Sequence, residues 1–229
     1  MWAWPTLCYC LWTVSTLTSK KDQPRGYHHG DLRNALVLAA VAAARVNGPS
    51  AVVVRDMARQ AGVSHNAAYR HFASREDLLT AVAEVGLGEL AASMRAGLSA
   101  TPRRRDRALR SRDRLRAIGQ AYVHYAVAEP GLFRAIWAAA SYPSPSPPSS
   151  GDITLSAGSD PYVILNSVLD ELVDTGAIPA ARRPYSETVA WSAVHGLSTL
   201  LIDGPLAGAS PVEIDRALDR LCDVIDAGL

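Results

Sequence analysis

The chain has 229 residues, of which 48% are hydrophobic, and its 23 basic side chains nearly balance 22 acidic ones. This composition supplies enough apolar surface for one large domain or two small ones, and it excludes a disordered or collagen-like chain. Its three cysteines provide neither a disulfide framework nor the ligand spacing of a zinc site. We therefore expect a reducing compartment, with no bound metal and no cofactor.

The small net charge conceals an uneven distribution along the chain. Residues 20–80 carry nine basic and five acidic side chains, residues 103–116 carry eight and two, and residues 117–229 carry five and thirteen. A basic front half before an acidic rear half is typical of a polyanion-binding module joined to a module with another task. For the arginine run at 103–116 taken alone, a solvated helix face is the simpler interpretation.

Residues 1–25 lack the pattern of a folded element. The first 19 are uncharged, and the only lysine pair follows the apolar stretch, whereas a secretory signal carries its positive charge at the start. Pro5 and several Ser and Thr interrupt the stretch, which is marginal in length for a membrane span. We expect a disordered tail, or a start codon assigned too far upstream.

Helical periodicity begins at Gly30 and predicts four helices in the front half of the chain. Leu32, Leu36 and Ala39 begin an apolar face on the first helix, which Gly48-Pro49 ends. Further helices are predicted over about Arg55–Ala61, over about His65–Phe72, and from Ser74, where Ser74 and Asp77 form a capping box.

The rear half is predicted to be helical as well, with one interruption. After Thr101-Pro102 an arginine-rich helix runs to Pro130-Gly131, and residues 141–161 form a mobile Pro/Ser/Gly-rich loop. The other helices are predicted over Leu132–Ala140, Tyr162–Ala177, about Tyr185–Ile202 and Val212–Ala227. Because no convincing strand appears, the predicted fold class is all-α.

The most informative stretch runs from residue 53 to residue 75, where two short helices flank a tight turn. Ala58 is small where the helices must approach closely, and Gly62 can adopt the positive φ that such a turn requires. Ser64 can cap the second helix. Apolar residues for the seam between the helices are supplied by Met57, Ala61, Val63 and Ala68. This is the layout of a helix-turn-helix motif.

The second helix of this motif would expose polar groups suited to a DNA duplex. His65, Asn66 and Arg70 are donors and acceptors that match base edges in a major groove. Tyr69 and His71 can reach phosphate oxygens. The amino end of the next helix, at Ser74 and Arg75, offers amides and a guanidinium to another phosphate. For Tyr69 and Phe72 a purely structural role in the core is the alternative.

The motif and its surroundings resemble the TetR family of bacterial transcriptional regulators. The segments that carry the resemblance are Arg55-Asp56-Met57-Ala58, Ala61-Gly62-Val63-Ser64, Tyr69-Arg70-His71-Phe72 and Ser74-Arg75-Glu76-Asp77-Leu78-Leu79. Tyr27-His28-His29-Gly30-Asp31-Leu32-Arg33 is similar to the helix-1 entry of one subgroup, and Trp191-Ser192-Ala193-Val194-His195-Gly196-Leu197 is similar to that subgroup's Trp-His-Gly signature. The resemblance covers about residues 26–229.

The resemblance implies a cytoplasmic, non-enzymatic homodimer whose DNA-binding domain spans residues 26–80. Residues 81–229 would dimerise and hold an unidentified small-molecule effector, and most such proteins are repressors that their ligand releases from an operator. The DNA-contact positions implied or predicted are Arg55, Ser64, His65, Asn66, Ala67, Tyr69, Arg70, His71, Ser74 and Arg75. The chain departs from the family at Val53, where a capping Ser or Thr is usual, and this loses about 1 kcal/mol.

Sites outside the motif are predicted from residue type and helical spacing. The pocket of a ligand-binding bundle would be lined by aromatic and a few polar residues, for which the candidates are Tyr122, His124, Tyr125, Trp137, Trp191 and His195, although core packing is the commoner role for any one of them. A four-helix dimer interface would use Val194, Ser198, Leu201, Leu218, Leu221 and Ile225. Lys20, Lys21 and Arg25 form either a basic arm that reaches DNA or a solvated tail.

The predicted function is therefore that of a DNA-binding regulator acting on a palindromic operator, and most such proteins are repressors. An activator of the same fold is one alternative. A helical enzyme with His124 or His195 as base is another, but no nucleophile elbow, phosphate loop or paired carboxylates support it. A third is an interaction protein tethered to a membrane by residues 1–19.

Overall fold

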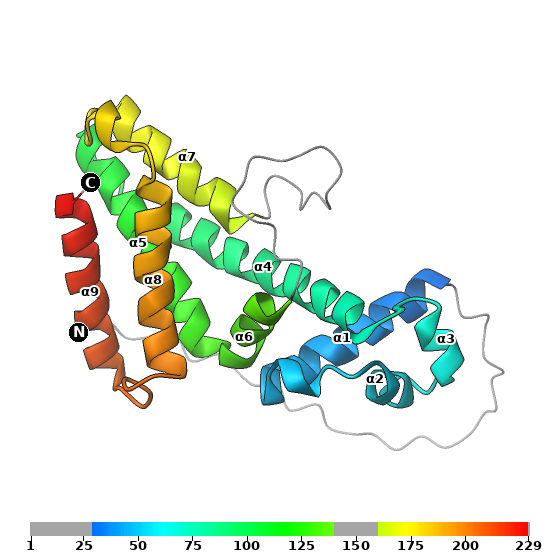
Figure 1. The fold of residues 1–229 in the computed structure, drawn as a ribbon. Coiled ribbons are helices and arrows are strands. Elements are labelled where there is room, and N and C mark those ends of the chain that lie inside the picture. The colour runs from blue at the N-terminus through cyan, green and yellow to red at the C-terminus, as the bar shows by residue number, and fades with distance from the viewer. Residues whose placement is uncertain (1–28, 140–159, 229) are drawn as a thin grey trace, which may run out of the picture.

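The computed structural model describes residues 29–139 and 160–228, and the regular elements in these ranges are all helical (Figure 1). The helices are α1 (His29–Asn47), α2 (Val54–Gln60), α3 (His65–Tyr69), α4 (Arg75–Ala100), α5 (Arg107–Ala128), α6 (Pro130–Ala138), α7 (Pro161–Asp174), α8 (Ser186–Ile202) and α9 (Pro211–Gly228). This confirms the predicted all-α fold class. The predicted tail 1–25, with Lys20, Lys21 and Arg25, and the predicted loop 141–161, except for its last two residues, lie outside the described residues.

Local signals in the sequence set most of the helix limits. α1 ends at Asn47 because Gly48 takes a φ of 71°. The capping box at the start of α4 is complete, since Ser74 Oγ accepts from the Asp77 amide and the Asp77 carboxylate accepts from the Ser74 amide, both at 3.0 Å. Val53, at the start of α2, caps with no side-chain hydrogen bond, as its residue type predicts.

Two helices end three residues earlier than the sequence predicts. α3 stops at Tyr69 rather than Phe72, because the chain tightens into a turn in which the His71 amide donates to Ala68 O at 3.0 Å. α7 stops at Asp174 rather than Ala177, because Gly176 takes a φ of 71° and its amide donates back to Val173 O at 2.9 Å. In both places a turn competes successfully with one more helical step.

The first hydrophobic cluster joins α1, α2, α3 and the amino-terminal half of α4. Leu36, Met57, Ala68 and Leu78 lie at its centre and are at most 1% exposed. Phe72 is also buried in it, which supports the structural alternative for that residue. The cluster fixes the short helices α2 and α3 against the longer ones, so that their remaining faces point outward.

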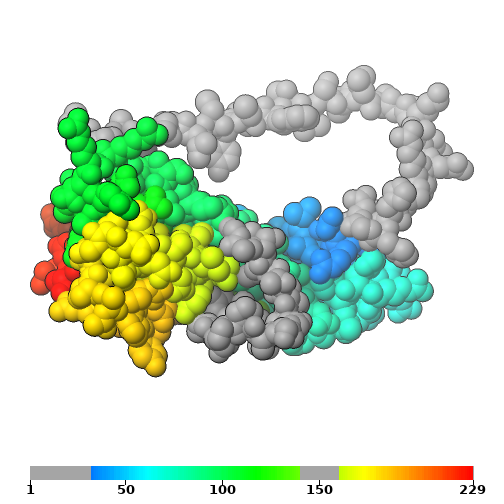
Figure 2. All heavy atoms as spheres, turned by 90° about the horizontal axis from the view of Figure 1, so that it is seen from above, coloured from blue at the N-terminus to red at the C-terminus, as the bar shows by residue number. Residues whose placement is uncertain are grey.

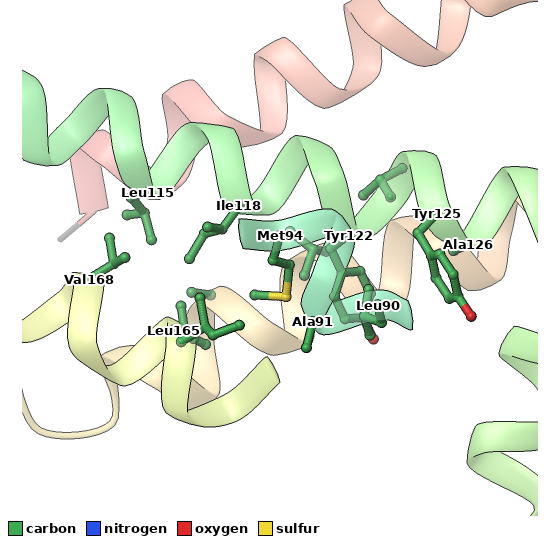
Figure 3. Packing of buried hydrophobic residues seen from close by; sticks show 14 of the residues in the cluster. Leu90, Ala91, Met94, Leu115, Ile118, Tyr122, Tyr125, Ala126, Leu165 and Val168 are labelled. Carbon is green, nitrogen blue, oxygen red and sulfur yellow. The ribbon is translucent and has the colours of Figure 1, made fainter. Parts of the chain in front are cut away.

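The second cluster joins the carboxyl-terminal half of α4 to α5, α6, α7, α8 and α9. Figure 3 shows Met94 of α4 lying among Ile118 and Tyr122 of α5 and Leu165 of α7. All four are buried. This cluster makes the helical domain that follows the helix-turn-helix unit.

Helix α6 belongs to both clusters. Leu132 and Ala135 pack into the first, whereas Phe133 and Ile136 pack into the second. The helix also approaches α1 closely at Gly131, where a Cβ atom would lie 2.2 Å from the carbonyl oxygen of Ala44. Only a residue without a side chain allows this approach.

The two ends of α4 lie at opposite ends of the molecule (Figure 1). With 26 residues at about 1.5 Å each, α4 is about 39 Å long. Its amino end contacts α1 next to the short helices, and its carboxyl end leads into α5 beside α7. Figure 2 shows the resulting elongated body, with α1 at one end and the helices coloured yellow to red at the other.

Candidate nucleic-acid interface

The turn between α2 and α3 is built as the sequence predicts. Gly62 takes a φ of 69°, and the Val63 amide donates to Ala58 O at 3.0 Å, so the turn satisfies its own backbone. Ser64 Oγ accepts from the Ala67 amide at 3.2 Å and caps α3. These bonds fix the direction in which the short helix α3 leaves the turn.

Helix α3 buries one face and exposes the other. Ala68 is fully buried against α2, whereas His65, Asn66 and Arg70 are exposed, and Tyr69 is 41% exposed. Tyr69 therefore lies at the surface of the domain and not among its buried core residues. The rings of His65 and Tyr69 lie 4.4 Å apart, so the two side chains support each other on the outer face.

The polar groups on this outer face are available for an external partner. Among the described residues, none forms a hydrogen bond or ion pair with the side chains of Asn66 or Arg70. The same holds for Arg55 in the first turn of α2, which is exposed beside them. An amide and two guanidinium groups can therefore donate to base edges or phosphates at no cost to the fold.

The remaining predicted DNA contacts have other structural tasks as well. Ser74 uses both its hydroxyl oxygen and its amide in the capping box, so its own amide is not among those that the amino end of α4 can offer to a phosphate. The guanidinium of Arg75 donates to Pro49 O at 2.6 Å and turns toward the connection between α1 and α2. His71 and Ala67 are half-buried at the edge of the exposed face. These four positions are therefore less available to DNA than Asn66 and Arg70.

A cavity lies in the second domain, mostly between α5, α8 and α9, and has a volume of about 40 Å³. Its wall is largely apolar, with three charged side chains at one end, and comprises Met94, Arg112, Leu115, Arg116, Ile118, Gly119, Tyr122, Leu165, Ala190, Trp191, Val194, Cys222, Ile225 and Asp226. A volume of this size holds two or three water molecules at most. The space left between these helices is therefore small.

The charged side chains at one end of the cavity pair with groups of the protein itself. The Arg112 guanidinium donates to the Asp226 carboxylate and to Ala177 O. Arg116 donates to Asp223 at 2.5 Å, and this hydrogen bond raises the pKa of its guanidinium. Burial raises the pKa of the Cys222 thiol, so that side chain is protonated and acts as part of the apolar wall.

Two of the six predicted pocket residues line this cavity, Tyr122 and Trp191. Trp137 and His195 lie beside it in an aromatic group, in which their rings are 4.5 Å apart and His195 Nδ1 is 3.0 Å from the Tyr122 hydroxyl. Burial lowers the pKa of His195, which is therefore neutral at pH 7.

The other two predicted pocket residues lie elsewhere. His124 is exposed on the face of α5 that meets α9, where its Nε2 is 3.1 Å from Asp215. Tyr125 is buried against α4 and donates to Gly86 O at 3.2 Å, and burial raises the pKa of its phenol. Placing His124 and Tyr125 in the cavity was wrong, because the helical phase of α5 turns Tyr122 toward it instead.

The predicted interface residues point inward. Within the single chain the buried members of that set are Val194, Ser198, Leu201, Leu218 and Ile225, and Leu221 is half-buried. The Ser198 hydroxyl also has a partner within the chain, because it donates to Val194 O at 2.8 Å. A second chain could reach these side chains only by opening the core, so this prediction is corrected.

Sequence reasoning missed the polar residues of the cavity and one joint between the domains. Arg112 and Arg116 are four residues apart, which places them on one face of a helix, beside the apolar Leu115. This spacing could have indicated that both arginines lie at the cavity. At the joint, Arg45 of α1 pairs with Glu89 of α4 at 2.5 Å and Glu129, next to α6, at 3.0 Å. No local pattern announces such a long-range pair.

This architecture defines a helix-turn-helix protein with a separate helical domain behind its DNA-facing unit. Residues 36–82 match the family model described as bacterial regulatory proteins, tetR family, and residues 115–225 match the one described as tetracyclin repressor-like, C-terminal domain. The two matches together span more than half of the chain. The chain belongs to the TetR family of DNA-binding transcriptional regulators.

Solved structures share the fold over most of its length. A protein of unknown function from Rhodococcus sp. RHA1 is 28% identical with a TM-score of 0.69, covering 90% of this chain and 99% of that one. A TetR family regulator from Marinobacter aquaeolei VT8 is 21% identical with a TM-score of 0.57, covering 84% and 94%. PfmR from Thermus thermophilus, a TetR family regulator, is 18% identical with a TM-score of 0.54, covering 85% and 98%.

No curated protein matches the chain. Among the helices of the two described ranges, none is both long and apolar enough to cross a lipid bilayer.

Proposed function

We propose that the protein is a transcriptional repressor that binds a palindromic operator as a homodimer and is released by a small, largely apolar effector. It would act through binding rather than catalysis, in the cytoplasm where its DNA target lies. The observation that carries the proposal is the outer face of α3. There Asn66 and Arg70 stand without partners among the described residues, on a helix whose direction the Ser64 cap fixes.

Dimer formation is supported by the outward faces of α8 and α9. These helices pack together at one side of the second domain (Figure 1). Each of them exposes large apolar side chains to solvent. The exposed fractions are 55% for Val189, 44% for Leu200, 57% for Val212 and 54% for Val224. Two helices from each subunit would cover these residues in a four-helix interface. This face replaces the inward-pointing residues predicted from the sequence.

Effector binding is supported by the cavity behind Tyr122 and Trp191. Its largely apolar wall favours a hydrophobic molecule, and its volume of about 40 Å³ is smaller than such a molecule needs. An effector would therefore have to move α5 relative to α8 and α9. A ligand that binds only the widened form shifts the protein toward that form, by an amount set by its difference in affinity for the two forms.

The DNA proposal is tested with the intergenic segment next to this gene, searched for an inverted repeat with half-sites about 34–36 Å apart. Fluorescence anisotropy compares this duplex with a shuffled one over a series of salt concentrations. We expect Asn66→Ala to lose about 1–3 kcal/mol of preference for the correct base. Arg55→Gln should weaken binding to both duplexes alike and lower the slope of log affinity against log salt by about 1 in magnitude.

Both side chains are exposed, so neither variant should change the melting temperature, which serves as the control for folding. A wild-type protein that binds the intergenic and shuffled duplexes equally would contradict the proposal. A reporter gene behind the same segment separates repression from activation by the sign of the response. Cell fractionation tests the membrane-tethered alternative, which requires the full-length protein in the membrane fraction.

A further inference from the structure

The eight arginines of residues 103–116 divide into two groups. Four are paired with carboxylates, Arg104 with Asp113, Arg112 with Asp226, Arg114 with Glu171, and Arg116 with Asp223. The side chains of the other four have no hydrogen-bond or ion-pair partner among the described residues, and they belong to Arg103, Arg105, Arg107 and Arg110. We call these four the distal arginine cluster. Pairing thus accounts for half of the run and leaves four positive charges without an internal role.

The cluster occupies a position that is unfavourable for cations. It spans the connection between α4 and α5 and the first turn of α5, where no acidic residue follows the cap. The Asp106 carboxylate at this end already accepts from the Leu109 amide at 3.0 Å. Positive side chains at a helix amino end are repelled by the helix dipole. The Asp106 carboxylate is one negative charge among four unpaired arginines, and an external anion would relieve the remaining repulsion.

The cluster lies at the far end of α4 from the DNA-facing helices α2 and α3 (Figure 1). α4, about 39 Å long, separates Arg103 from the end of the molecule that carries α3. Figure 2 shows the green segment around the start of α5 at the opposite end of the body from the cyan helices. The exposed apolar faces of α8 and α9 do not include it. Its partner would therefore be a second molecule or a second stretch of the same one.

The chemistry of this segment selects among polyanions. From Arg95 to Ala121 there is no aromatic residue, so the segment has no platform on which single-stranded bases could stack. Leu109, 49% exposed, is its one exposed large apolar side chain among the described residues. One leucine is too little for the apolar core of a protein interface or for insertion into a lipid surface. Guanidinium groups alone suffice for the phosphate backbone of a duplex.

We propose that the distal arginine cluster binds the phosphate backbone of a second DNA duplex without reading its sequence. A dimer would then hold its operator through the two α3 helices and a second DNA segment through the two clusters, and it would bridge them. Four phosphate contacts in one cluster give a slope of about −3.6 for log affinity against log salt. Affinity should therefore fall about 150-fold between about 50 and 200 mM salt.

The first experiment isolates the cluster in the full chain. In a variant whose recognition face is neutral, Arg55→Ala with Asn66→Ala and Arg70→Ala, the binding of a shuffled duplex is followed by anisotropy. We expect residual binding, with a slope of log affinity against log salt of at least about 3.6 in magnitude. Adding Arg→Gln at all four cluster positions should abolish it, whereas Arg→Lys at the same positions should preserve it, because charge is retained. No residual binding, or equal binding by the Gln variant, overturns the proposal.

The second experiment tests bridging with the unaltered recognition face. Beads carrying the intergenic duplex are loaded with protein, washed, and mixed with a labelled shuffled duplex. Wild type and the Lys variant should capture the label, and the Gln variant should load equally but lose most of the capture. Capture by the Gln variant at the wild-type level overturns the proposal. Failure of the wild type to prefer the intergenic duplex would instead count against the operator proposal, and the two failures are thus distinguishable.

Discussion

Replacing Gly131 with alanine should force α6 away from α1. The added Cβ would lie 2.2 Å from Ala44 O and 2.5 Å from Arg45 O, both backbone atoms that cannot rotate away. Ordinary contact begins at 3.4 Å, so the helices must separate by about 1.2 Å. Overpacking of this kind costs about 1–3 kcal/mol. For a chain of this length the melting temperature should fall by about 2–12 °C.

The matched control is Gly88→Ala in α4, where a Cβ meets nothing within 4 Å. There alanine only improves helix propensity and should stabilise the protein by about 0.5–1 kcal/mol. Thermal unfolding followed by circular dichroism measures both variants under the same conditions. If Gly131→Ala melted at or above the wild-type temperature, the close approach of α6 to α1 would be wrong.

Three further predictions concern the cap at Ser74, the half-buried His195 and the cavity. Ser74→Ala should lose about 1 kcal/mol in urea unfolding, while Ser74→Asp, which keeps an acceptor, should lose little. Burial lowers the pKa of His195, so the unfolded chain takes up a proton that the folded chain refuses. Stability should therefore fall as the pH drops below about 6.5. In unfolding experiments at several pH values, His195→Gln should lack this loss of stability. A variant with the same pH profile as the wild type would refute the prediction. Gly119→Leu places a side chain in the cavity and should abolish the response to an apolar effector in the DNA-binding assay, which Gly119→Ala should retain.

The sequence predicted best what is decided by a few neighbouring residues. The positive φ of Gly62, the Ser64 cap and the capping box at Ser74 each depend on contacts three or four residues apart. Local hydrogen-bonding rules therefore suffice for the helix-turn-helix unit. The exposed face of α3 followed from the same information, because the turn fixes the phase of so short a helix.

The inward faces of α8 and α9 could not be predicted in this way. α8 carries apolar residues on several sides, and Val189 is exposed whereas Val194 is buried. Periodicity gives no phase for such a helix, because each side satisfies the apolar pattern. For α5 the same ambiguity led to the prediction that His124 lines the cavity. The position of His124 is decided instead by the packing of α9 against α5. These choices depend on residues far away in the chain.

The sharing of α6 between two hydrophobic clusters has a consequence for how the molecule unfolds. Leu132 and Phe133 are neighbours in the chain, yet they seal different cores. A fragment cut after residue 80 would leave the first core open where Leu132 and Ala135 cover it. The two modules should therefore melt in a single cooperative transition, and amide hydrogens in α1 should exchange no faster than those in α5.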